Sequence, residues 1–353
     1  MPTSNKAQVL IIGAGAIGII LGYHLELAGA DITFLVRPHR LNELQNPQTL
    51  YCHDDHSLKV FKGYHYITEV SELLDKTYDY IFIALDGAAL KSESGQNLIR
   101  TIGKAAAGAQ NTTKVLIGSF YFDIRSWFLE LSGLPGNRVC TCNAAIHAYY
   151  TKAFKMPTVV TSSESSSSIT QADWAYADRF STGAAFHVLD DCPEVAQSFA
   201  ELYNACQVSK CIIRSPDEDA LFGNVAPIAF AAAELLGWPK FRDIDPDDDI
   251  WKLATDAAKE VMGLKLHGEA GANAAAHLEP SLFLEGMKHY EKTFGTFDII
   301  AFSRYHHGGK VQAQDKKHLQ ESILHGEKDG KSMQALKAIV QRVELGSLGP
   351  VST

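Results

Sequence analysis

The chain has 353 residues, of which 46% are hydrophobic and 21% are charged, and it carries a formal net charge of −9. This length allows two domains, because a single core rarely grows beyond about 250 to 300 residues, and the composition is that of a globular protein. The negative charge, with no run of basic residues, argues against nucleic acid and anionic lipid as partners. No apolar run approaches the roughly 20 residues that cross a bilayer, and the first residues lack a signal-peptide pattern, so we expect a cytoplasmic protein.

Neither the cysteines nor the acidic residues show the spacing of a metal site. Cys140 and Cys142 flank one residue inside an apolar run, which favours buried free thiols in a reducing compartment. The acidic run at residues 243–249 could in principle hold calcium, but it lacks the glycine and the distal glutamate of an EF-hand loop. Helix capping and solvation are the favoured interpretation, and we expect no bound metal.

The first 36 residues follow a strand–helix–strand pattern. Ala7 to Ile12 form a short apolar run typical of a parallel strand that is covered on both faces. After a glycine-rich turn, apolar residues recur from Ile17 to Ala28 at intervals of three to four, and Gly29 is placed to end this helix. Asp31 to Val36 is the second predicted strand.

Three further apolar runs are typical of buried strands, at Tyr80 to Leu85, Lys114 to Gly118 and Arg138 to Cys142. The stretches between them are long enough for crossover helices, which predicts a mainly parallel sheet. The serine-rich segment 161–170 cannot bury apolar surface, so we expect it to form a surface loop.

The character of the sequence changes after about residue 215. Ala220 to Trp238 and Trp251 to Leu266 are alanine-rich and helical in period, and strand-like alternation largely disappears. We therefore predict an α/β domain over residues 1–214, an all-helical domain over residues 215–345 and a short tail at 346–353.

The turn after the first strand carries the most specific motif. Residues 13–18 read G-A-G-A-I-G, which fits G-x-G-x-x-G between a buried strand and an amphipathic helix. Gly13 permits the tight turn, Gly15 lets the backbone approach a pyrophosphate, and Gly18 allows the helix to pack on the strand. The free N–H groups and the positive dipole end of the helix attract the phosphates. The sequence thus predicts a Rossmann domain that binds a dinucleotide through Gly13, Ala14, Gly15, Ala16, Ile17 and Gly18.

The end of the second strand indicates which dinucleotide is bound. An acidic residue there would accept a hydrogen bond from the ribose 2′-OH of NAD, but the chain continues instead with Arg37 and Arg40. A guanidinium pairs with a phosphate in a forked geometry, which suits the additional 2′-phosphate of NADP. We predict NADP as the cofactor, with Arg37 as the principal contact and Arg40 as its helper.

These features resemble the ketopantoate reductase family. Tyr80 to Leu85 is similar to the family's fourth strand, and His147-Ala148 resembles a small-residue segment beside the nicotinamide. The resemblance implies a Rossmann domain followed by a helical domain, with the substrate between them, and hydride transfer from NADPH to a 2-oxo acid. It places Leu85, Asp86, Ser119 and Ala148 at the cofactor site, although Asp86 replaces a lysine of the family and Ser119-Phe120 replaces its asparagine-glycine.

The chain departs from the family where the family's catalytic residues would lie. In the family, a lysine four residues before an asparagine acts as general acid; if Asn224 is that asparagine, Ala220 replaces the lysine. The family glutamate would fall within residues 303–319, which contain none. Counting from Ser303 gives Asp315 in its place. Counting back from His325, which lies in a segment that resembles the end of the family's long penultimate helix, gives Lys310. These losses argue against simple ketopantoate reduction, because carbonyl reduction needs a proton for the developing alkoxide.

Other side chains near that segment could transfer the proton. His306, His307 and Lys310 surround Gly308-Gly309, which we interpret as a flexible turn between helices. Lys310 or a histidine could act as general acid or bind a substrate carboxylate. The alternative is a polar surface turn.

Two further positions are candidates. His147 and Tyr149 follow a predicted strand and would lie at the carboxyl edge of the sheet, where ligands bind in open α/β folds; a structural hydrogen bond is the alternative for His147. Asn224 could hold the substrate or cap a helix. The candidate catalytic residues are Lys310, Asn224, His147, Ser303 and Asp315.

The leading hypothesis is an NADPH-dependent oxidoreductase that reduces a small carbonyl compound. An imine or opine-type reductase is the second, because such a substrate can arrive protonated and the missing acid matters less. A catalytically silent NADPH-binding sensor or interaction protein is the third. A homodimer through helical surfaces is an additional expectation.

Overall fold

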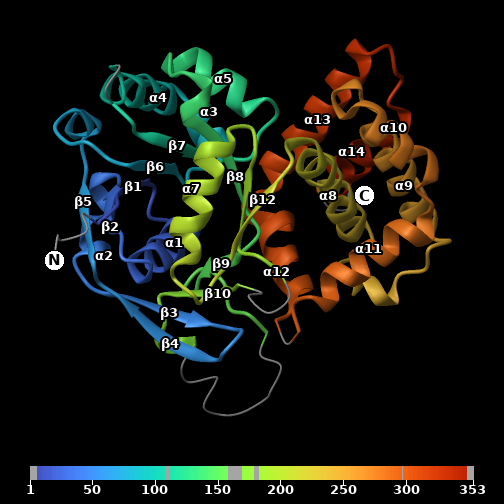
Figure 1. The fold of residues 1–353 in the computed structure, drawn as a ribbon. Coiled ribbons are helices and arrows are strands. Elements are labelled where there is room, and N and C mark those ends of the chain that lie inside the picture. Colours follow the sequence, from blue (N-terminus) through green and yellow to red (C-terminus); the bar gives the residue numbers. More distant parts are fainter. Residues whose placement is uncertain (1–5, 109–110, 158–168, 179–182, 296, 348–353) are drawn as a thin grey trace. The chain divides into compact units, whose positions relative to one another are not determined.

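The computed structural model describes residues 6–108, 111–157, 169–178, 183–295 and 297–347 (Figure 1). The chain forms two compact units, Met1–Ser215 and Pro216–Thr353. Most of the serine-rich segment 161–170 lies outside the described residues, as do residues 348–353 of the expected tail.

The first unit is built on an eight-stranded sheet in the order β12-β11-β8-β7-β6-β1-β2-β5. All neighbouring strands are parallel except β8 and β11, which confirms the predicted mainly parallel sheet. Three strands, β5, β11 and β12, were not predicted. The strands are β1 (Gln8–Ile12), β2 (Asp31–Leu35), β5 (Tyr64–Ile67), β6 (Tyr80–Ile83), β7 (Lys114–Ile117), β8 (Val139–Ala144), β11 (Phe186–Leu189) and β12 (Cys211–Arg214).

Helices cover both faces of this sheet. In β1, Val9 and Ile11 belong to the core on one face, while Leu10 and Ile12 belong to the core on the other. This alternation explains why the strand is a continuous apolar run. One core includes residues of α1 (Ala16–Leu27) and α7 (Pro193–Asn204), and the other includes residues of α3 (Gly87–Lys91), α4 (Glu93–Ala105) and α5 (Ile124–Ser132).

A second sheet in the first unit was not predicted. It has four strands in the order β4-β3-β10-β9. Strands β3 and β10 pair in parallel although more than 120 residues separate them in the sequence. The strands are β3 (Gln48–Cys52), β4 (Ser57–Phe61), β9 (His147–Tyr150) and β10 (Trp174–Ala177).

The second unit is helical throughout its described residues, as predicted. Helix α9 packs against α8 and α14, and its fully buried Trp251 stacks on Phe283 of α11. Asp248 caps α9 by accepting hydrogen bonds from the N–H groups of Ile250 and Trp251, so part of the acidic run does cap a helix. The helices are α8 (Pro216–Leu235), α9 (Asp249–Met262), α10 (Gly268–His277), α11 (Pro280–Lys292), α12 (Ile299–Tyr305), α13 (Gln312–Lys328) and α14 (Gln334–Ser347).

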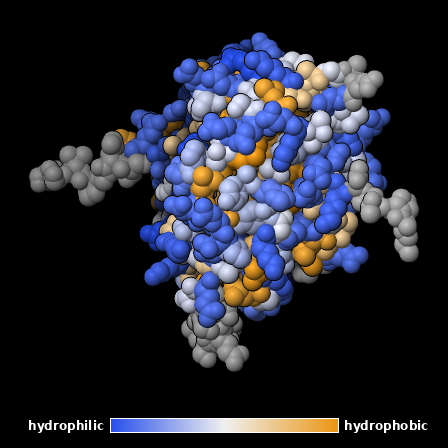
Figure 2. Space-filling model, turned by 90° about the vertical axis from the view of Figure 1, so that its left-hand side faces the viewer, coloured by the Kyte–Doolittle hydropathy of each residue, from blue (hydrophilic) through white to orange (hydrophobic). Residues whose placement is uncertain are grey.

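The surface is predominantly hydrophilic in the view of Figure 2, where apolar residues form only small groups. No helix in the described part of the chain is long and apolar enough to cross a membrane. All six cysteines are buried and carry free thiols.

Three histidines, of which His24 and His318 are buried and His53 is partly buried, predict how the free energy of unfolding depends on pH. Burial lowers the pKa of His24 to about 3 and those of His53 and His318 to about 4, from an ordinary value of 6.5. Below pH 6.5 the unfolded chain therefore binds protons that the folded protein does not, and the free energy of unfolding should fall as the pH decreases toward 4. Each group contributes up to about 1.4 kcal/mol per pH unit. Urea unfolding should show a flatter profile for His318→Gln than for the parent; parallel profiles would contradict this origin.

Candidate functional site

The glycine-rich turn has the geometry that a dinucleotide requires. Gly13 has a φ of +101°, a left-handed conformation that side chains disfavour, and its N–H donates to the Leu35 carbonyl at 3.0 Å. A Cβ on Gly18 would lie 2.0 Å from the Gly13 carbonyl oxygen, so only glycine allows this approach of α1 to the turn. A Cβ on Gly15 would meet no atom within 4 Å.

The N-terminus of α1 is available to an anion. Gly15 is its N-cap, no side chain caps it, and its first turn, which contains Ala16 and Ile17, has no acidic residue. Its first N–H groups have no carbonyl one turn earlier to bind. The turn therefore offers main-chain donors beside open space, which fits a pyrophosphate.

Three of the other predicted cofactor residues follow β6 and β7 at the same edge of the sheet. Leu85 lies against the turn, with its Cδ2 atom 3.1 Å from the position of a Cβ on Gly13. The buried Ser119 donates from Oγ to the Leu85 carbonyl at 2.7 Å. Asp86 accepts from the Ala89 N–H at 2.7 Å and so caps α3. Each of these residues thus has a structural contact, and that of Leu85 is with the glycine-rich turn itself.

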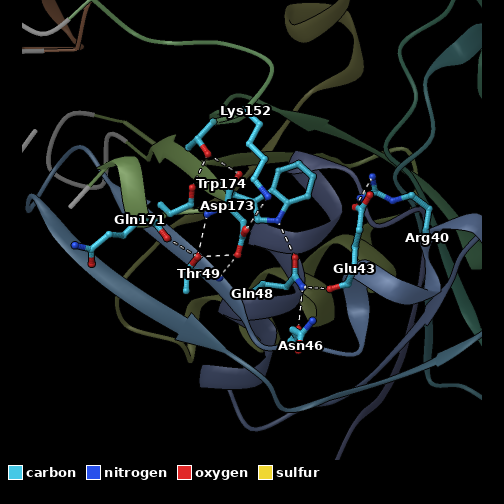
Figure 3. Close-up of polar contacts among 11 residues, drawn as sticks. Arg40, Glu43, Asn46, Gln48, Thr49, Lys152, Gln171, Asp173 and Trp174 are labelled. Atoms are coloured by element: carbon cyan, nitrogen blue, oxygen red, sulfur yellow. Dashed lines mark hydrogen bonds and ion pairs between the residues drawn. The ribbon is translucent and has the colours of Figure 1, made fainter. Parts of the chain in front are cut away.

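The two arginines after β2 differ in how they are held. Arg37 is exposed and precedes the short helical turn Pro38–Arg40. Arg40 donates from Nη2 to the Ala14 carbonyl at 3.1 Å, and its Nη1 lies 2.8 Å from Glu43 Oε2 (Figure 3). Arg40 is therefore the arginine whose guanidinium group contacts the glycine-rich turn.

The structure places His147, Ala148 and Tyr149 in β9 of the four-stranded sheet, which begins three residues after the carboxyl end of β8. Ala148 is buried in the core that also contains residues of α1. His147 Nδ1 lies 3.0 Å from the Ala145 carbonyl, and the buried Tyr149 hydroxyl lies 2.9 Å from His53 Nε2.

In the second unit, Asn224 and Ser303 are both buried. Asn224 lies well inside α8, so it does not cap that helix, and its Nδ2 is 3.4 Å from His267 Nε2. Ser303 lies in α12, and its Oγ atom has no hydrogen-bond partner among the described residues.

The segment around Gly308-Gly309 is not the flexible turn that we expected. Residues His306–Lys310 form one π-helical turn between α12 and α13. A Cβ on Gly308 would lie 3.0 Å from the Trp238 ring, so this glycine permits close packing. Such π-turns occur often at functional sites. Lys310 is exposed on this turn.

The π-turn brings His307 and Asp315 together, a pairing that the sequence did not reveal. His307 Nδ1 lies 2.8 Å from Asp315 Oδ2, and each side chain is about 20% exposed. The His307 ring stacks on Phe230 of α8 with a centroid distance of 3.9 Å. Eight residues of straight helix would span about 12 Å, so only a bend in this segment allows the contact. The arrangement fixes the ring and leaves Nε2 as the nitrogen available for proton transfer.

Comparison with known proteins gives one sequence match. Residues 9–112 match the family model of ketopantoate reductase PanE/ApbA. No curated protein matches the chain.

Solved structures share the fold over almost the whole chain. The 2-dehydropantoate 2-reductase of Geobacter metallireducens GS-15 is 14% identical, with a TM-score of 0.65 over 96% of this chain and 99% of that one. The enzyme of the same name from Methylococcus capsulatus is 13% identical, with a TM-score of 0.64 over 97% of each chain. A D-mandelate dehydrogenase in complex with NADH and anilino(oxo)acetate is 11% identical, with a TM-score of 0.60 over 96% of this chain and 97% of that one. At these identities the likeness establishes the fold.

Proposed function

We propose a reductase function for this chain, which belongs to the ketopantoate reductase family through its residues 9–112. It would be an NADPH-dependent oxidoreductase that transfers a hydride to a small carbonyl compound related to the 2-oxo acids. The observation that carries this proposal is the open space in front of Gly15 at the uncapped N-terminus of α1. The names of the structurally similar reductases and dehydrogenase support it.

The residues present fit the proposed cofactor. The main chain of Gly13 to Gly18 would hold the pyrophosphate, and the guanidinium groups of Arg37 and Arg40 would hold the 2′-phosphate. Leu85 lies against this turn and Ser119 bonds to the Leu85 carbonyl; with Asp86, which follows Leu85 in the chain, they would complete the cofactor site. For Ala148 we propose only a packing role, since it is buried in the core. When bound, the cofactor supplies the hydride.

A proton must also reach the oxygen of the carbonyl group. We propose that His307, held by Asp315, supplies it, because a carboxylate on Nδ1 fixes the tautomer and orients the ring. Lys310 is the alternative donor. Asn224 and Ser303 would bind the substrate through their polar atoms, whereas the contact of His147 with the Ala145 carbonyl favours a structural role.

Mixing the purified protein with NADPH and a panel of 2-oxo acids, with and without amines, tests this proposal. We expect NADPH to be oxidised by 2-oxo acids alone. Oxidation only when amines are present would indicate an imine or opine-type reductase. Tight NADPH binding without any turnover would indicate a sensor or interaction protein.

The exposed apolar residues of the helical unit support a proposal of homodimer formation. Phe222, Leu282 and Leu324 are each more than half exposed. Light scattering on the purified protein would measure the assembly state.

The buried free thiols support a reducing compartment such as the cytoplasm.

A further inference from the structure

We propose that Arg40 is the principal phosphate-binding residue of the first unit, and that Glu43 sets the preference between NADPH and NADH by competing with the phosphate for Arg40. This inference rests on the proposed function, because it concerns the same cofactor. It reverses the roles that the sequence suggested for Arg37 and Arg40.

The guanidinium of Arg40 is held in place before any ligand binds. Nη2 donates to the Ala14 carbonyl in the glycine-rich turn, and the group lies 5.9 Å from the centre of the Trp174 ring. The side chain is 27% exposed. Because these contacts restrict its rotamers, binding a phosphate costs Arg40 little conformational entropy. Arg37 is exposed and would have to be ordered on binding.

The Trp174 ring next to Arg40 is itself held in place by a buried hydrogen bond. Trp174 Nε1 donates to Gln48 Oε1 at 3.0 Å, and both residues are 5% exposed. Gln48 Nε2 in turn donates to the carbonyls of Glu43 at 2.8 Å and Asn46 at 3.0 Å (Figure 3). These bonds fix the end of the short helix α2 (Leu41–Leu44), which carries Glu43.

Glu43 pairs with the Nη1 group of Arg40, which a bound phosphate would also use. Its Oε2 atom lies 2.8 Å from Arg40 Nη1, and its side chain is 46% exposed. An arginine has five N–H donors, and a phosphate binds best to a pair of parallel ones. A carboxylate on Nη1 removes one donor from such a pair, and its negative charge repels the incoming phosphate. Glu43 should therefore weaken the binding of NADPH and hardly affect NADH.

Isothermal titration calorimetry on the purified full chain tests this proposal, with NADPH, NADH, adenosine 2′,5′-bisphosphate and adenosine 5′-monophosphate as probes. Glu43→Gln should tighten NADPH and the bisphosphate by roughly three- to tenfold, a range suited to a partly exposed ion pair. NADH and the monophosphate should change less than about twofold, because they lack the 2′-phosphate. The gain should shrink as the salt concentration rises.

Glu130→Gln is the matched control, because it removes the same charge from an exposed position on α5. Arg40→Gln should weaken NADPH by more than about tenfold, and by more than Arg37→Gln does. Thermal unfolding checks that each variant is folded. The Glu43 variant still tests the proposal if the Arg40 variant does not fold.

The possible results separate this inference from the proposed function. If the parent protein binds neither dinucleotide, both fail. If it binds NADPH but Glu43→Gln leaves the affinity unchanged, or if Arg37→Gln has the larger effect, only this inference is overturned. A weaker binding of NADH by Glu43→Gln would also overturn it, because Glu43 would then accept a hydrogen bond from the ribose 2′-OH.

Discussion

Replacing Gly15 with valine should abolish dinucleotide binding while leaving the free energy of unfolding within about 1 kcal/mol of the parent. Gly15 has φ −79° and ψ −174°, an extended conformation that any L-residue adopts. Its Cβ would meet no atom within 4 Å, so the valine side chain enters no protein core. That side chain would instead fill the space that the proposed pyrophosphate needs, directly in front of the N–H groups of α1.

Calorimetry with NADPH and urea unfolding would measure these two effects. Gly18→Ala is the contrasting variant, because its Cβ would lie 2.0 Å from the Gly13 carbonyl oxygen. It should destabilise the fold by at least about 2 kcal/mol, since the backbone itself must move. If Gly15→Val bound NADPH with the parent's affinity, the turn would not be the phosphate site.

Replacing His307 with glutamine should lower turnover by about 10²- to 10⁴-fold, the usual contribution of general acid catalysis, without changing the affinity for NADPH. Glutamine keeps a polar side chain of similar size but cannot protonate. Asp315→Asn should lower turnover by a smaller factor, because the imidazole remains but the carboxylate that holds Nδ1 is lost.

Single-turnover kinetics with NADPH and the best substrate of the panel would measure this effect. Lys310→Ala is the comparison, since Lys310 lies exposed on the same π-turn. If Lys310→Ala abolished turnover and His307→Gln did not, the proton donor would be Lys310.

The elements predicted from the sequence are those with a strong local signal. The run before Gly13 is apolar at every position because both faces of β1 are covered, and the glycine motif follows at once. The four-stranded sheet gave no such signal. In its strand β4, partly exposed residues alternate with exposed ones, and the strand has no continuous apolar run. Strand β3 pairs with a strand that comes much later in the chain. Pairing between distant segments does not follow from local periodicity.

The same limit applies to the candidate site. The sequence identified the glycine-rich turn and both arginines, but the contact of Arg40 with Ala14 depends on how the chain folds back after β2. In the second unit, His307 and Asp315 were both considered separately. Their pairing depends on a π-turn, which residue spacing does not predict.

The hydrogen bond between Trp174 and Gln48 has a consequence for how the protein can be divided. The stretch that matches the family model ends at residue 112, yet β3 inside it pairs with β10, and β7 follows that stretch directly. Excising residues 9–112 would leave Gln48 without the indole donor and β6 without its neighbour β7. The proposed nucleotide site therefore depends on segments outside the matched stretch, and residues 9–112 alone should not reproduce it.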